Sequence, residues 1–164
     1  MSDYLRWGGV AIIFLCAFLF GKEYSARADR GVLEYRGFAA LLLHIEGEIS
    51  RAMSFAEGLW KGFADERLEE CGFLPLLKKG KTPSAAFEEC KNKLVMPKEA
   101  KEKLSELFSA FGRNYRESEL KRLTKVRGEL EADLSAYAEE VEKNKKVINA
   151  LLLGVAASAA IIMI

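Results

Sequence analysis

The single histidine is the first residue to consider for catalysis or metal binding. His44 lies between Leu43 and Ile45, in a stretch with apolar residues at helical spacing. A metal site or a cysteine–histidine nucleophile pair needs partners at suitable spacing, and none lies near His44 in the sequence. We therefore expect a structural histidine.

Paired carboxylates are the second candidate for chemistry. Glu46 and Glu48 are two residues apart, so on a helix their side chains diverge by about 200° and do not form a local acid–base pair. The adjacent pairs diverge equally, and all are typical of a solvated helix face. They are Glu69–Glu70, Glu88–Glu89 and Glu139–Glu140.

The cysteines and the lysine-rich segment do not predict a catalytic, metal or nucleotide site either. Cys16, Cys71 and Cys90 are odd in number and lack CxxC spacing, so we expect reduced thiols that act as small apolar side chains. Lys78–Thr82 ends in Gly-Lys-Thr, but a phosphate loop would need a glycine where Pro75 stands. The net charge of +1 comes from Lys and Arg alternating with Glu, without a basic stripe. We expect no enzyme, cofactor, metal, small-molecule substrate or nucleic acid.

Two apolar runs flank the segment that carries these residues. Residues 5–21 form a run with only Arg6 charged, and residues 147–164 carry no charge over 18 residues, about 27 Å of helix. We predict transmembrane helices at 5–21 and 147–164, with a helical domain at 22–146 between them. The alternative for the first run is a signal peptide cut after Ala26-Arg-Ala28, which Lys22 and Glu23 disfavour.

The flanking charges predict the orientation of these two helices. The positive residues next to the runs lie on their inner sides, and Arg6 alone lies outside. The positive-inside rule therefore predicts a two-pass membrane protein with a cytoplasmic domain and both termini outside. The inner residues are Lys22, Arg27, Arg30, Lys143, Lys145 and Lys146.

Residues 22–146 have the apolar spacing of an all-α bundle of about five to six helices. One stripe contains Phe38, Leu41, Leu42, Ile45 and Ile49. A capping box at Ser54–Glu57 predicts a second helix with Leu59 and Phe63 inward. Cys71–Pro75 predicts a helix stop, Thr82 and Pro83 begin a helix that runs to Val95, and Pro97 begins another that ends near Gly112.

The last predicted helix begins after a cap at Asn114 and runs without a break into the C-terminal apolar run. Leu120, Leu123, Leu130, Leu134 and Val141 follow spacings of three and four. Polar breaks at Arg127 and Asn144 favour packing on the other helices over an autonomous coiled coil. Within the two apolar runs, Ala17 with Gly21 and Gly154 with Ser158 are small-xxx-small pairs that permit close helix packing, although alanine-rich helices also show such pairs by chance.

Several strings resemble the stage III sporulation protein AB family of endospore-forming bacteria. The resemblance rests on Arg36–Ile49, a leucine-rich helix ending in Glu-Ile, on Leu107–Gly112 with its Phe-Gly terminus, and on the charged helix 117–146 that enters the final apolar run. It implies a component of a transenvelope sporulation complex, with a soluble domain similar to those of type II secretion inner-membrane platform proteins and engaging a cognate ATPase.

On this resemblance we expect a non-enzymatic platform in the bacterial cell membrane, on the mother-cell side of a spore former. Its expected partners are the ATPase, other membrane proteins of the complex and lipid. Glu46 and Glu48, in the Glu-Ile string, and Arg113 and Arg116, beside the Phe-Gly turn, are the expected partner contacts. The alternatives are a helical signalling or coiled-coil adaptor, and a membrane enzyme whose site is assembled from distant residues.

Overall fold

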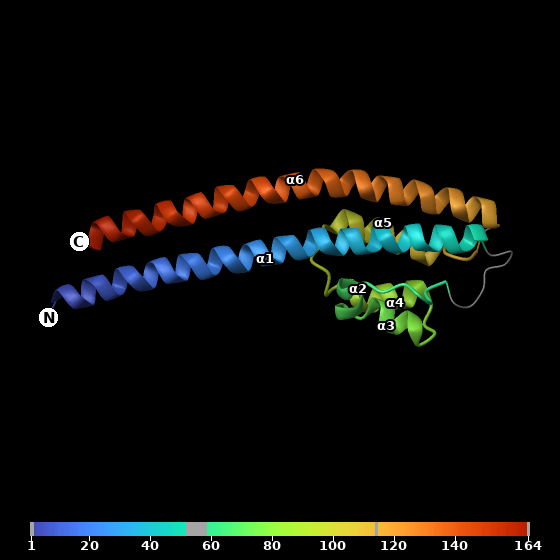
Figure 1. Ribbon diagram of the computed structural model, residues 1–164, viewed down its shortest axis with the longest axis horizontal. Coiled ribbons are helices and arrows are strands. Elements are labelled where there is room, and N and C mark those ends of the chain that lie inside the picture. Colours follow the sequence, from blue (N-terminus) through green and yellow to red (C-terminus); the bar gives the residue numbers. More distant parts are fainter. Residues whose placement is uncertain (1, 52–58, 114, 164) are drawn as a thin grey trace. The chain divides into compact units, whose positions relative to one another are not determined.

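A computed structural model describes residues 2–51, 59–113 and 115–163. All regular structure in these ranges is helical, which confirms the all-α prediction. The helices are α1 (Ser2–Arg51), α2 (Glu66–Glu70), α3 (Phe73–Lys78), α4 (Pro83–Cys90), α5 (Lys98–Ser109) and α6 (Arg116–Met163) (Figure 1).

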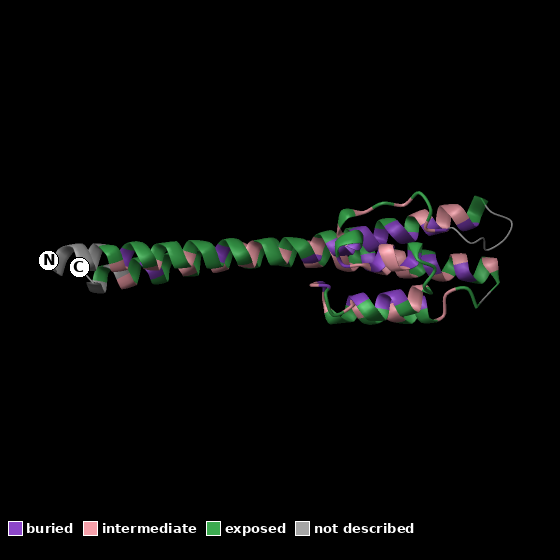
Figure 2. Ribbon diagram, turned by 90° about the horizontal axis from the view of Figure 1, so that it is seen from below, coloured by how far each residue is buried: buried purple, intermediate pink, exposed green. Residues whose placement is uncertain are grey.

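The chain divides into two compact units, which we describe separately. Met1–Asp29 and Tyr137–Ile164 form the paired-helix unit, and Arg30–Ala136 form the bundle. Exposed residues dominate the paired-helix unit, whereas buried residues concentrate in the bundle (Figure 2). The helices α1 and α6 each contribute to both units.

The helix α1 contains both the apolar run at 5–21 and the stripe that starts at Phe38, which the sequence predicted as separate helices. It continues through residues 22–37, where no proline interrupts the backbone hydrogen bonds. Over Gly8–Arg51 it contains an 18-residue window with a mean hydropathy of 1.5 and only 6% of its residues buried, so it is long and apolar enough to cross a membrane. It is the one helix that passes this test among the residues the structure describes.

The core of the bundle is a cluster of four phenylalanines from four helices. Phe38 of α1, Phe73 of α3, Phe87 of α4 and Phe108 of α5 are at most 2% exposed. Their ring centroids are 5.2–6.3 Å apart in tilted or edge-on pairs, the arrangement that aromatic quadrupoles favour. The predicted α1 stripe is buried in full, because Leu41, Leu42, Ile45 and Ile49 join Phe38 at 0–3% exposure.

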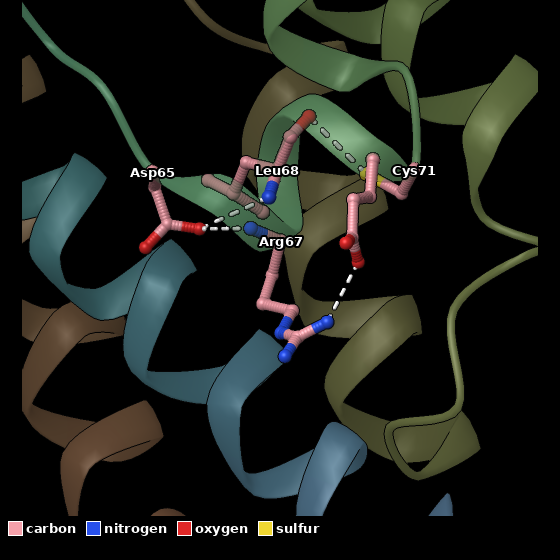
Figure 3. A network of polar contacts seen from close by, with 5 residues as sticks. Asp65, Arg67, Leu68 and Cys71 are labelled. Carbon is pink, nitrogen blue, oxygen red and sulfur yellow. Dashed lines mark hydrogen bonds and ion pairs between the residues drawn. The ribbon is translucent and has the colours of Figure 1, made fainter.

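The short helices α2 and α3 differ from the prediction. The predicted capping box at Ser54–Glu57 lies outside the described residues, and residues 59–65 form turns and coil instead of continuing a helix, although Leu59 is buried. The helix α2 begins at Glu66, because the Asp65 carboxylate accepts hydrogen bonds from the backbone N–H groups of Arg67 and Leu68, each at 3.0 Å (Figure 3).

The predicted stop at Cys71–Pro75 is half correct. Gly72, at φ 95°, ends α2 and turns the chain into α3, a conformation that favours glycine. Pro75 then lies in the first turn of α3 and does not end a helix. A proline fits there because first-turn N–H groups have no partner within the helix.

At the remaining boundaries, the cap of α4 and the glycine after α5 are as predicted, whereas the end of α4 is not. The Thr82 hydroxyl accepts a hydrogen bond from Ala85 N at 3.3 Å, with Pro83 at the start of α4. The helix α4 ends at Cys90, earlier than the predicted Val95. Gly112, at φ 78°, supplies the left-handed residue after α5. The predicted cap Asn114 lies outside the described residues, and α6 runs unbroken from Arg116 to Met163, as predicted.

Candidate docking surface

The single histidine lies against an aromatic ring. The His44 ring lies 5.4 Å from that of Phe63, and its buried Nε2 has no hydrogen-bond partner there. No three His, Cys, Asp or Glu side chains within these ranges come together in a way that could hold a metal ion. The contact that the structure gives His44 is therefore packing against the Phe63 ring.

The cysteines are free thiols, with Cys16 exposed and Cys71 and Cys90 buried. The Cys71 Sγ–H donates to the Leu68 carbonyl at 3.5 Å (Figure 3), and the Cys90 Sγ–H donates to the Phe87 carbonyl at 3.4 Å. The hydrogen bond between the two thiols raises the pKa of Cys90, as burial also does, and lowers the pKa of Cys71.

A buried carboxylate on α1 accepts hydrogen bonds from the segment that connects α4 to α5. Glu34 is 3% exposed, and its Oε2 accepts hydrogen bonds from Val95 N at 2.6 Å and Met96 N at 2.9 Å. Burial raises the pKa of Glu34 and outweighs these two amide bonds, which lower it. This role of Glu34 was not predicted from the sequence. The available signal was a carboxylate four residues before Phe38, on the same helix face.

Glu46, one of the four predicted contact residues, serves the bundle itself. Its Oε1 accepts from Arg127 Nε at 2.9 Å, with the two side chains 13% and 20% exposed. Arg127 also pairs with Glu131 at 2.7 Å, and its hydrogen bond to Glu46 is the main cause of its raised pKa. The pair joins α1 to α6 and leaves Glu46 little surface to offer a partner.

The other three predicted residues come together at one end of the bundle. Arg116 Nη2 donates to the Ser50 carbonyl at 2.5 Å, so the start of α6 satisfies a carbonyl in the last turn of α1. Glu48, 34% exposed, pairs with Arg51 in that same turn at 3.2 Å. Arg113 is exposed in the turn between α5 and α6. Figure 1 shows the C-terminal end of α1 and the start of α6 side by side.

Aromatic side chains extend this surface beyond the predicted residues. The Trp60 and Phe111 rings lie 5.7 Å apart and are both partly exposed, and Tyr115 is 90% exposed. Their signal in the sequence was an aromatic on each side of the Gly112 turn. Exposed aromatics beside arginine are the residue types that dominate binding energy at protein interfaces. We call this surface the loop end, and its residues are Glu48, Arg51, Trp60, Phe111, Arg113, Tyr115 and Arg116.

The small residues of the paired-helix unit occupy two different settings. Gly21 is buried, and a Cβ added there would lie 2.9 Å from Asn149 Oδ1 and 3.2 Å from Leu152 Cδ1, so α1 and α6 pack closely at this glycine. Ala17 is partly exposed one turn earlier. Gly154 has nothing within 4 Å of such a Cβ, and the Ser158 hydroxyl donates to the Gly154 carbonyl at 2.9 Å. Only Gly21 of the two glycines therefore brings α1 and α6 close together.

These features define an all-helical protein with a long apolar N-terminal helix. The sequence profile of the stage III sporulation protein AB family matches residues 6–164, and the chain belongs to that family. It is a sporulation family and is not one of the known enzyme families. Comparison with curated proteins and with solved structures gives no significant match.

Proposed function

We propose that the chain is a non-enzymatic membrane platform in a transenvelope, secretion-like sporulation complex, where it couples a cytoplasmic ATPase to membrane partners. Membership of a stage III sporulation family supports the process. The long apolar α1 supports membrane anchoring, and the unbroken α6, which carries the second apolar run, supports a second span.

The observation that carries the platform role is the loop end. It combines exposed arginine and aromatic side chains, whereas Glu46 is committed to Arg127 within the bundle. Exposed charges contribute little to stability but strongly affect association. Arg113 and Glu48 are therefore the proposed ATPase contacts, with Tyr115 as the aromatic anchor.

Co-purification of the ATPase with the full-length chain tests this docking. Arg113→Glu and Tyr115→Ala should weaken ATPase recovery at least about tenfold, because contact hot spots contribute about 2 kcal/mol or more. Lys79→Glu is the matched control, since Lys79 is an exposed lysine in the turn after α3, outside the loop end. Equal ATPase recovery from all three variants, at equal protein levels, would refute the docking surface. Normal spore yield from a deletion strain would refute the platform role.

Labelling of single cysteines tests the proposed two-pass topology. The native cysteines are replaced, and one cysteine is placed at Lys98, whose side chain is 88% exposed, or at Ser2. An impermeant thiol reagent should label position 2 in intact cells and position 98 only after permeabilisation. Labelling of position 98 in intact cells would show that the bundle is not cytoplasmic.

A further inference from the structure

A groove of about 550 Å³ lies between α1 and α6 in the paired-helix unit, and its lining changes character along its length. One end is apolar, with Phe14, Phe18, Leu152 and Leu153. The other end is polar, with Lys22, Ser25 and Asn149. The two helices run antiparallel here, because Gly21 meets Asn149 while Asp29 pairs with Lys145 at 2.9 Å, so the polar residues of both helices gather at the same end.

The polar end of the groove holds hydrogen-bond donors that the protein does not use. Among the residues that the structure describes, neither the Lys22 ammonium nor the Asn149 amide has a hydrogen bond or ion pair. The neighbouring Lys145 is different, because Asp29 and Glu142 both accept from it at 2.9 Å. An amide without a partner in an apolar run is unfavourable, so polar residues in such runs commonly mark a binding site.

The apolar end of the groove is exposed to whatever surrounds the helices. Phe18 is 69% and Leu153 is 63% exposed, and Phe14 is 39% exposed. The volume lies within the range of roughly 300–1,000 Å³ that holds small ligands. A ligand that fills this groove must therefore be amphiphilic, with an apolar chain along the phenylalanines and an acceptor-rich group beside Lys22 and Asn149.

We infer that the groove binds one anionic glycerophospholipid. The acyl chain lies against Phe14, Phe18 and Leu153, and the phosphate accepts hydrogen bonds from the Lys22 ammonium and the Asn149 amide. A phosphodiester offers only acceptors and a negative charge, which complements these two donors. In an anionic lipid no headgroup cation offsets that charge beside Lys22, as choline does in phosphatidylcholine. The inference rests on the proposed membrane anchoring and adds a specific lipid site to it.

Native mass spectrometry of the full-length chain, released from nanodiscs of mixed phosphatidylcholine and phosphatidylglycerol, tests the site. The unmodified chain should retain one phosphatidylglycerol in preference to phosphatidylcholine. Lys22→Gln should reduce this retention about fivefold, the effect of one cation near a lipid surface. Asn149→Leu should also reduce it, because leucine removes the amide donor and keeps the apolar character of the helix. Arg27→Gln is the charge-matched control, since Arg27 is exposed on α1 outside the groove, and it should retain the lipid as the unmodified chain does.

The outcomes separate this inference from the proposed function. A chain that enters nanodiscs but retains both lipids equally, or loses phosphatidylglycerol equally in Lys22→Gln and Arg27→Gln, overturns the lipid site and leaves the anchoring intact. A chain that leaves the nanodisc as a lipid-free dimer overturns it in favour of a second copy in the groove. A chain that does not enter nanodiscs overturns both.

Discussion

Removal of the Glu34 carboxylate gives the sharpest test of how the bundle is held together. Glu34→Ala leaves the N–H groups of Val95 and Met96 without their acceptor, and Met96 is 1% exposed. A buried donor that loses its partner costs about 1–3 kcal/mol, and Val95 is only partly buried, so we expect a loss of about 2–4 kcal/mol. Glu34→Gln keeps an oxygen for both amides and should change the free energy of unfolding by less than about 1 kcal/mol at neutral pH.

The pH dependence of stability distinguishes the Glu34 carboxylate from an uncharged acceptor such as the amide of Glu34→Gln. Burial raises the pKa of Glu34 above its ordinary value of 4.5, so the native state binds this proton more tightly than the unfolded chain does. The contribution of Glu34 to stability is therefore fully present at acidic pH and decreases as the pH rises through the raised pKa. Stability of the unmodified chain relative to Glu34→Gln should fall over that range and then become constant.

Urea titration of the full-length chain in detergent measures these free energies through Trp60 fluorescence, in a Trp7→Phe background. The Trp60 ring packs against Phe111 at 5.7 Å in a tilted arrangement and so reports on the bundle. Glu106→Ala, which removes an exposed carboxylate from α5, should change the free energy of unfolding by less than about 0.5 kcal/mol. A Glu34→Ala variant as stable as Glu106→Ala would refute the role of the carboxylate, and a pH dependence of opposite sign would refute the raised pKa.

Three further perturbations probe other contacts. Phe87→Ala removes a fully buried ring from the phenylalanine cluster and should cost about 3–5 kcal/mol in the same urea titration; a loss below about 1 kcal/mol would contradict the packing. Arg127→Met leaves Glu46 without its cation and should cost about 1–3 kcal/mol, whereas the double change that also makes Glu46→Gln should restore part of the loss; identical values for the single and double variants would show no coupling. Gly21→Val adds side-chain atoms where a Cβ alone would lie 2.9 Å from Asn149 Oδ1, so cross-linking between cysteines placed on α1 and α6 should fall. Gly154→Val, where nothing lies within 4 Å of an added Cβ, should leave the cross-linking unchanged.

The helical elements were predictable where the sequence carries local signals. The stripes around Phe38 and Leu104 follow the helix period, and Thr82 with Pro83 fixes the start of α4 through a side-chain cap. The errors have tertiary causes. The predicted helix to Val95 ends at Cys90, and the Val95 amide instead donates to Glu34, 61 residues away, a contact that no local pattern encodes.

The candidate contact residues show the same division. The strings around Glu48 and Arg113 place both residues near helix ends, where Arg113 is exposed and the Glu48 side chain is 34% exposed. The sequence could not indicate that Glu46 would face Arg127, 81 residues later, or that Arg116 would bond to Ser50. Each of these depends on how α6 packs against α1, which is decided by the whole apolar core.

The phenylalanine cluster also determines when the bundle can form during synthesis. Its four rings come from α1, α3, α4 and α5, so the aromatic core stays incomplete until Phe108 has left the ribosome. A nascent chain that stops before α5 presents Phe38, Phe73 and Phe87 without their common partner, and exposed apolar surface of this kind attracts chaperones and proteases. The aromatic core is therefore complete only when α5 joins α1, α3 and α4, and α6 follows α5 directly in the chain.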